Sequence, residues 1–139
     1  MLIQGELTER IIGSFYKVYD VLGFGFLESV YRRALAYELR KHGLHVECEV
    51  VTDVWHESEL VGHFKADMIV EGKVIVENKA SRLILAEDRK QLMNYLRATN
   101  VEVGLLLHFG PRAAFQRIAY TNLAKRRREK ASQNPRSSA

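Results

Sequence analysis

The sequence has little of what builds a secreted or membrane-spanning protein. Its 139 residues include one cysteine, Cys48, so no disulfide can form within the chain. Its apolar runs are far shorter than the roughly eighteen residues that a membrane helix needs. Glu6 and Glu9 interrupt the beginning of the chain, where a signal peptide would be apolar. We therefore expect a protein of the reducing cytoplasm without a membrane partner.

Several common catalytic motifs are also missing. The five histidines show no recurrent spacing that would place two zinc ligands on one face. The glycine-rich segment 23–26 lacks the lysine and the strand–loop–helix context of a phosphate-binding loop. No arrangement of histidine and acid around Cys48 indicates a nucleophile, and we expect this residue to fill space. The sequence therefore disfavours zinc, P-loop and cysteine chemistry.

Charge is unevenly distributed along the chain. The sequence has 21 basic and 17 acidic residues and a net charge of +4, yet residues 1–124 contain one more acid than base. We predict a single domain over residues 1–124, followed by a disordered basic tail over residues 125–139. The tail either binds nucleic acid by counterion release or only increases solubility. Its candidate phosphate contacts are Lys125, Arg126, Arg127, Arg128 and Lys130.

Hydrophobic periodicity predicts an α/β fold. Three-and-four spacing of apolar residues predicts helices, and alternation or short continuous apolar runs predict strands. The predicted helices cover residues 7–22, 27–42 and 85–98. The predicted strands cover residues 44–55, 59–70, 73–80 and 101–109, with one further candidate over 115–120. A helical hairpin is therefore followed by a three-stranded meander, a helix and a buried strand.

The hairpin between the second and third predicted strands has two registers. A two-residue loop would place Asp67 opposite Val76 and mix both faces. A three-residue loop over 71–73, with Gly72 in the left-handed conformation, places Asp67 opposite Glu77. We predict this second register. Its apolar face would consist of Phe64, Ala66, Met68, Val70, Val74 and Val76. Its opposite face would consist of Lys65, Asp67, Ile69, Ile75, Glu77 and Lys79.

Two adjacent carboxylates on one strand face call for a cation. Asp67 and Glu77 would repel each other, and a hard divalent ion such as Mg²⁺ or Mn²⁺ relieves that repulsion through oxygen ligands. Lys79, on the same face, could hold a water molecule against a phosphate and offset its charge. The alternative is an ordinary exposed strand with alternating charges.

These residues resemble the PD-(D/E)XK nuclease superfamily. Asp67 followed by the segment 77–79 matches its signature, and residues 25–31 match the motif of the GxxExxY family. Residues 91–95 reproduce the QxxxY motif of one branch of the superfamily. The resemblance covers roughly residues 7–120. It implies a restriction-endonuclease-like core of helix, three-stranded meander, helix and strand, here with an extra N-terminal helix.

The resemblance also implies roles for individual residues. Asp67 and Glu77 would bind the metal, and the carbonyl group of Asn78 would complete its protein ligands. Lys79 would position the attacking water, and Glu28 would reach the metal, often through water. On the following helix, Gln91 and Tyr95 would support Lys79 or touch the substrate phosphate.

Some of these residues have ordinary structural interpretations. Glu28 would also favour the positive end of a helix, and Gln91 with Tyr95 would also form a simple surface pair. Asn78 departs from the expected pattern, because its side chain would point to the apolar face, where an unpaired amide is costly.

The function expected from the sequence is Mg²⁺-dependent hydrolysis of phosphodiester bonds, with DNA favoured over RNA as substrate. One alternative is a non-catalytic module of the same fold that binds nucleic acid or protein. Another is a phosphodiesterase that uses the same site on small molecules. The oligomeric state stays open, with a homodimer as one alternative.

Overall fold

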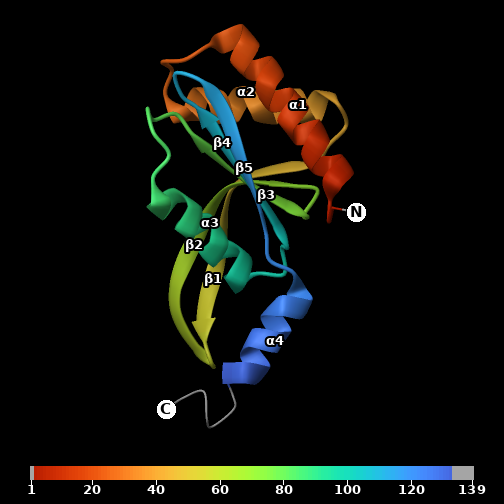
Figure 1. The fold of residues 1–139 in the computed structure, drawn as a ribbon, viewed down its shortest axis with the longest axis vertical. Helices are drawn as coiled ribbons and strands as arrows, with labels where there is room; N and C mark the ends of the chain where they lie inside the picture. The colour runs from red at the N-terminus through yellow and green to blue at the C-terminus, as the bar shows by residue number, and fades with distance from the viewer. Residues whose placement is uncertain (1, 133–139) are drawn as a thin grey trace.

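A computed structural model describes residues 2–132, in which helices cover both faces of a five-stranded sheet (Figure 1). The helices are α1 (Gly5–Leu22), α2 (Glu28–Lys41), α3 (Ala86–Ala98) and α4 (Asn122–Ser132). The strands are β1 (Val46–His56), β2 (Glu59–Val70), β3 (Val74–Lys79), β4 (Val103–Phe109) and β5 (Ala113–Ala119). The predicted α/β order is confirmed, and α4 is an element that the sequence analysis did not predict.

The strands follow one another across the sheet in the order of the chain. β3 and β4 are parallel, whereas the other neighbouring strands are antiparallel. A parallel pair needs a crossover connection, and α3 provides it. None of the helices in residues 2–132 is long and apolar enough to cross a membrane.

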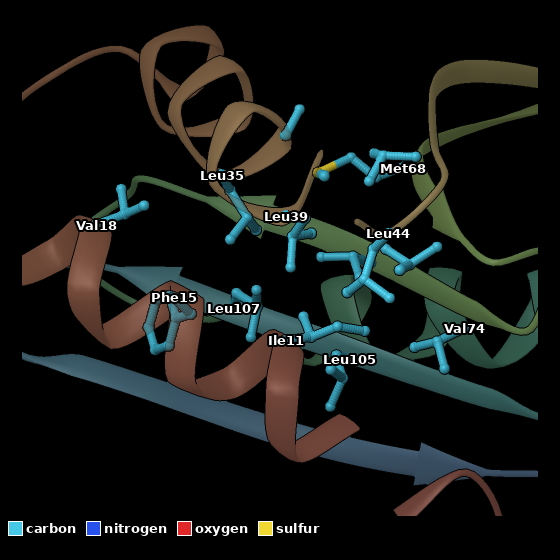
Figure 2. Packing of buried hydrophobic residues seen from close by; sticks show 14 of the residues in the cluster. Ile11, Phe15, Val18, Leu35, Leu39, Leu44, Met68, Val74, Leu105 and Leu107 are labelled. Carbon is cyan, nitrogen blue, oxygen red and sulfur yellow. The ribbon is translucent and has the colours of Figure 1, made fainter. Parts of the chain in front are cut away.

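One core fills the space between the sheet and the helices α1 and α2 (Figure 2). Phe109 of β4 contacts two aromatic rings. Its ring centroid lies 4.3 Å from that of Tyr31 in a stacked arrangement and 4.8 Å from that of Phe15 in an edge-to-face arrangement. Each such ring pair contributes about 0.5–1.5 kcal/mol beyond the burial of its area. These contacts attach both N-terminal helices to the sheet and thereby fix the start of α2.

A second, smaller core lies under α3 on the other face of the sheet. Leu92, Tyr95 and Leu96 of α3 are buried there against Ile75 and other sheet residues. Gly104 permits this close approach, because a Cβ atom added to it would lie 2.7 Å from Leu92 Cδ1. The mostly apolar strand β4 is buried along its whole length because helices cover both faces of the sheet.

The predicted register of the β2–β3 hairpin is confirmed. Val70 pairs with Val74 around the loop 71–73, and Gly72 has the predicted positive φ of 63°. Glu71 shares this conformation, with a φ of 55°. The loop thus turns through two left-handed residues rather than one.

The predicted division of β2 between two faces is correct only in part. Met68 packs in the α1–α2 core as expected, whereas Phe64 and Ala66 pack against α3. The change of face lies at Asp67, opposite Glu49, whose φ of 53° interrupts the regular strand. Beyond this point the β1–β2 ribbon curves away from the rest of the sheet (Figure 1).

The C-terminal segment also differs from the expected disordered tail. Residues 125–132 continue the helix α4, although the segment has no apolar face. Polar contacts attach it: Lys125 Nζ donates to the carbonyl groups of Thr99 and Val101, and Asn122 N donates to Glu102. Residues 133–139 lie outside the described part of the chain.

Candidate active site

Asp67 and Glu77 meet at the point where β2 and β3 separate. Their regular pairing runs from Val70–Val74 to Met68–Val76. Beyond Met68 and Val76, backbone N–H groups of the two strands bond to carboxylates instead of to backbone carbonyl groups. Asp67 N donates to Glu77 Oε1 at 3.2 Å, and Asn78 N donates to Asp67 Oδ2 at 3.1 Å. The predicted proximity of the two carboxylates is therefore present.

The buried amide of Asn78 is explained largely by Asp67. Its Nδ2 donates to Asp67 Oδ2 at 2.6 Å and lies 3.2 Å from Met68 Sδ. Its Oδ1 has no hydrogen-bond partner among the described residues. An unsatisfied buried oxygen costs about 1–3 kcal/mol. The structure tolerates this cost where the same side chain orients a nearly buried carboxylate.

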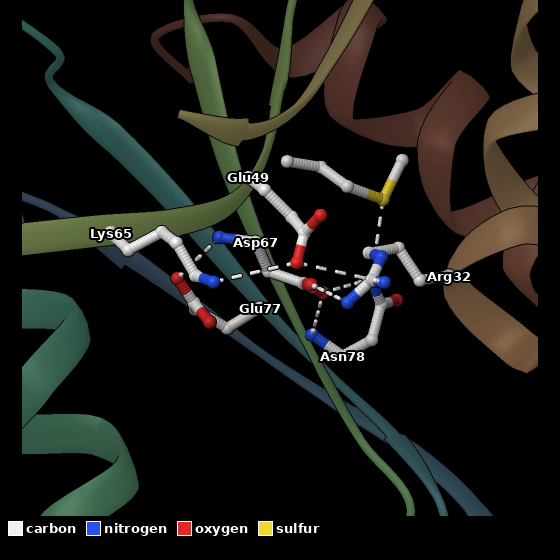
Figure 3. Close-up of polar contacts among 7 residues, drawn as sticks. Arg32, Glu49, Lys65, Asp67, Glu77 and Asn78 are labelled. Carbon is white, nitrogen blue, oxygen red and sulfur yellow. Dashed lines mark hydrogen bonds and ion pairs between the residues drawn. The ribbon is translucent and has the colours of Figure 1, made fainter. Parts of the chain in front are cut away.

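Helix α2 supplies a cation to this carboxylate (Figure 3). The Arg32 guanidinium lies 3.2 Å from Asp67 Oδ1 and 3.8 Å from Glu49 Oε1. Lys65 reaches the same Glu49 oxygen at 3.4 Å. These side chains, together with Glu28 and Glu77, line a pocket of about 190 Å³. Four acids on four different elements thus share one small pocket with two cations.

The motif over residues 25–31, from which Glu28 was predicted to be a site residue, fixes the position where α2 begins. Gly25 has a φ of 118°, a conformation that other residues rarely adopt. Tyr31 OH donates to the carbonyl oxygen of Gly23 and accepts a bond from Phe26 N. The buried tyrosine therefore ties the loop before α2 to the core, and Glu28 begins the helix beside the pocket.

Burial disfavours the ionised forms of two acids in the site. The pKa of Glu77 is raised to about 7, chiefly because burial removes its hydration. The Asp67 carboxylate contributes to this rise, whereas the Asp67 N–H and Lys79 oppose it. Partial burial also raises the pKa of Glu28, which Lys79 opposes and Asp67 reinforces. A cation in this pocket would relieve both acids.

A model of the PD-(D/E)XK nuclease superfamily matches residues 5–118. The chain belongs to the PD-(D/E)XK nuclease superfamily. Members of this superfamily are generally nucleases that use divalent metals. No curated protein matches the chain significantly.

A solved structure described as the crystal structure of SSO0001 is similar in fold. It has 24% sequence identity to this chain and a TM-score of 0.55, over 95% of this chain and 69% of that chain. This likeness agrees with a restriction-endonuclease-like architecture, which the arrangement of five strands and four helices also supports.

Lys79, the lysine of the superfamily signature, lies beside the acidic pocket rather than in its lining. Its Nζ lies 3.7 Å from Asp88 Oδ1, and its charge acts on both Glu77 and Glu28. Asp88 Oδ2 also accepts the backbone N–H of Leu85 at the start of α3. The beginning of α3 therefore holds the signature lysine near the acids.

The two residues of the QxxxY motif are not brought to this pocket. Tyr95 is buried between its own helix, α3, and the sheet. Its ring packs on Phe64, and its hydroxyl group forms a hydrogen bond of 3.1 Å with the Thr52 hydroxyl group. Gln91 is exposed, and its side chain makes no hydrogen bond within residues 2–132. In this arrangement Tyr95 is a core residue and neither side chain supports Lys79.

The donors available to a metal ion are hard oxygen ligands. Asp67, Glu77 and Glu28 contribute carboxylates to the pocket, which is the donor chemistry that Mg²⁺ and Mn²⁺ prefer. Within residues 2–132, no three acid, histidine or cysteine side chains are grouped closely enough to hold an ion as they stand. The residue types fit a divalent ion, and Arg32 now occupies one oxygen of Asp67.

Four charged residues near the acids were not predicted as site residues: Arg32, Glu49, Lys65 and Asp88. Arg32 had a detectable signal, because it follows Glu28 by four residues and so shares its helix face. Lys65 was on the predicted charged face of β2. Glu49 and Asp88 reach the site through the sheet pairing and the α3 crossover, which no local pattern reveals.

Proposed function

We propose that this protein is a divalent-metal-dependent nuclease that hydrolyses phosphodiester bonds of DNA. The observation that carries the proposal is the meeting of Asp67 and Glu77 where β2 and β3 separate, beside Glu28 of α2. Asp67, Glu77 and the backbone carbonyl group of Asn78 would hold the ion, with Glu28 acting through water. A divalent ion in such a site supplies Lewis-acid activation of the phosphate and of water.

The other side chains have roles that follow from their charge. Lys79 positions the attacking water and offsets the charge that develops on the phosphate. Arg32 presents a guanidinium whose planar donors suit phosphate oxygens, and it must leave Asp67 to reach them. The matching residues 25–31 further support assignment to the GxxExxY branch.

One observation favours the alternative of a non-catalytic binding module. Both oxygens of Asp67 already accept hydrogen bonds, one from Arg32 and the other from Asn78. A site that keeps this arrangement would bind a nucleic acid without cleaving it.

Cleavage assays distinguish the two functions. Single- and double-stranded DNA and RNA are incubated with the full chain in Mg²⁺, Mn²⁺ or EDTA. We expect metal-dependent cleavage that Lys79→Gln reduces at least about 100-fold, within the range for loss of a charge-stabilising group. The matched control is Lys90→Gln on the exposed surface of α3, which retains cleavage. Absence of cleavage on every substrate, with binding retained, would support the binding module.

A further inference from the structure

A groove of about 810 Å³ runs along α2 beside β1 and joins the candidate site. It shares two lining residues with the acidic pocket, Arg32 and Glu49. Residues 1–124 are almost neutral, yet the tertiary structure places four basic residues and one acid along this groove. They are Arg32, Arg33, Arg40, Lys41 and Glu49.

Two of the basic residues and a tyrosine line the groove at regular spacing along α2. Arg33, Tyr37 and Lys41 recur every four residues of α2, so each lies about 6 Å further along the helix. Arg33 and Lys41 are exposed, and their side chains make no hydrogen bond or ion pair with other residues of the described part. Arg40 differs, because it donates to the carbonyl oxygen of Val46 at 2.7 Å.

An aromatic side chain stands among these cations. Tyr37 lines the groove and is 67% exposed. An exposed ring beside a line of positive charge is the combination by which proteins bind unpaired strands, since bases stack on the ring while phosphates meet the cations. A duplex hides the faces of its bases within its own stack, so it cannot use the ring in this way.

We infer that this groove binds a single-stranded nucleic acid and leads it to the acidic pocket. Tyr37 stacks on a base, Arg33 and Lys41 contact phosphates, and Arg32 lies at the junction of groove and pocket. The binding step stands on the groove itself. Its link to hydrolysis rests on the proposed nuclease function and deepens it by naming an unpaired strand as the substrate.

Binding is measured by fluorescence anisotropy of the full chain in EDTA, which separates binding from cleavage. The probes are fluorescein-labelled oligonucleotides of mixed sequence and about 16 nucleotides, the upper range for one small binding module. They are a single-stranded DNA, the RNA of the same sequence and the DNA duplex. We expect the wild type to bind the single strands more tightly than the duplex.

The variants test stacking and charge separately. Tyr37→Ala should weaken single-strand binding about five-fold or more, whereas Tyr37→Phe, which keeps the ring, should stay within about two-fold of the wild type. Replacing both Arg33 and Lys41 by glutamine should lower the slope of log affinity against log salt by about 1.4 for single strands. Lys90→Gln, outside the groove, is the charge control for each substitution. Thermal unfolding confirms that each variant is folded.

The outcomes are distinguishable. Unchanged single-strand affinity of Tyr37→Ala, or an equal loss on the duplex, would overturn the groove proposal. Tighter binding of RNA than of DNA would support the groove and identify RNA as its strand. If the variants behave as expected but the wild type cleaves nothing in Mg²⁺ or Mn²⁺, the groove stands and the nuclease proposal fails. If cleavage is metal-dependent and these variants bind normally, the nuclease proposal stands and the groove fails.

Discussion

Helices α2 and α4 both carry basic residues, but they lie at opposite ends of the molecule (Figure 1). Helix α2 lies beside the acids near the C-terminal end of β3, whereas α4 attaches to residues 99–102, just before β4. By sequence alone α4 is the more basic segment. The charges of α4 are mostly exposed, whereas Arg32 of α2 and the nearby Lys65 share a pocket with four acids. Density of charge along a chain therefore does not locate a site; convergence of charges from several elements does.

The largest difference between the two ends should appear in catalysis. Asp67→Asn at the α2 end is expected to abolish metal-dependent cleavage, with a loss of at least about 100-fold, because it removes a proposed metal ligand. Arg128→Gln in α4 is expected to leave kcat within about two-fold. Both are measured at saturating substrate. Equal losses in the two variants would mean that α4 takes part in the chemistry.

Stability should respond to pH at the α2 end. Glu77 has a pKa raised from 4.5 to about 7, so the folded protein binds a proton that the unfolded chain releases between these values. Wild-type stability without metal should therefore fall as pH rises from about 4.5 to 7, by about 3 kcal/mol at most.

Glu77→Gln removes this dependence and keeps the oxygen that accepts from Asp67 N. In EDTA the variant should match the wild type at pH 4 and exceed it at pH 8. Glu87→Gln, an exposed acid at the start of α3, is the control and should show no such gain. Urea unfolding at both pH values measures the difference in stability. A variant less stable than the wild type at pH 8 would contradict the proposed cost of ionising Glu77.

A smaller loss of stability is expected where α4 attaches to the domain. Lys125→Met keeps the aliphatic stem but removes the donor to the Thr99 and Val101 carbonyl groups, at a cost of about 1–2 kcal/mol. Lys130→Met, in the exposed last part of the same helix, should change stability by less than about 0.5 kcal/mol. Thermal unfolding compares them. Equal stability of the two variants would mean that these bonds do not hold α4 in solution.

The smallest effect concerns the contribution of α4 to nucleic-acid binding. Arg127→Gln should lower the slope of log affinity against log salt by about 0.7–0.9 if this residue contacts one phosphate. The preference for single strands over duplex should not change, because Tyr37 of α2 is intact. A lost preference in this variant would place strand recognition at α4, and an unchanged slope would leave Arg127 without a phosphate contact.

Much of the fold could be predicted because its patterns are local. The order of helices and strands followed from hydrophobic periodicity, and the β2–β3 register followed from the loop around Gly72. The faces of β2 could not be predicted throughout, since the irregular backbone at Glu49 belongs to the neighbouring strand. The helix of residues 125–132 was missed because polar contacts with distant carbonyl groups, rather than an apolar face, attach it.

The sequence by itself determined the succession of elements and the pair Asp67 and Glu77, because a period-two pattern and a short loop specify which residues face each other. Only the tertiary structure decided which other residues join them. Packing of α2 brought Arg32 to Asp67, packing of α3 buried Tyr95 away from the pocket, and the α2–β1 contact made a groove from separate charges. The physical reason is that helix packing depends on the whole core, whereas pairing across a hairpin depends on a few neighbouring residues.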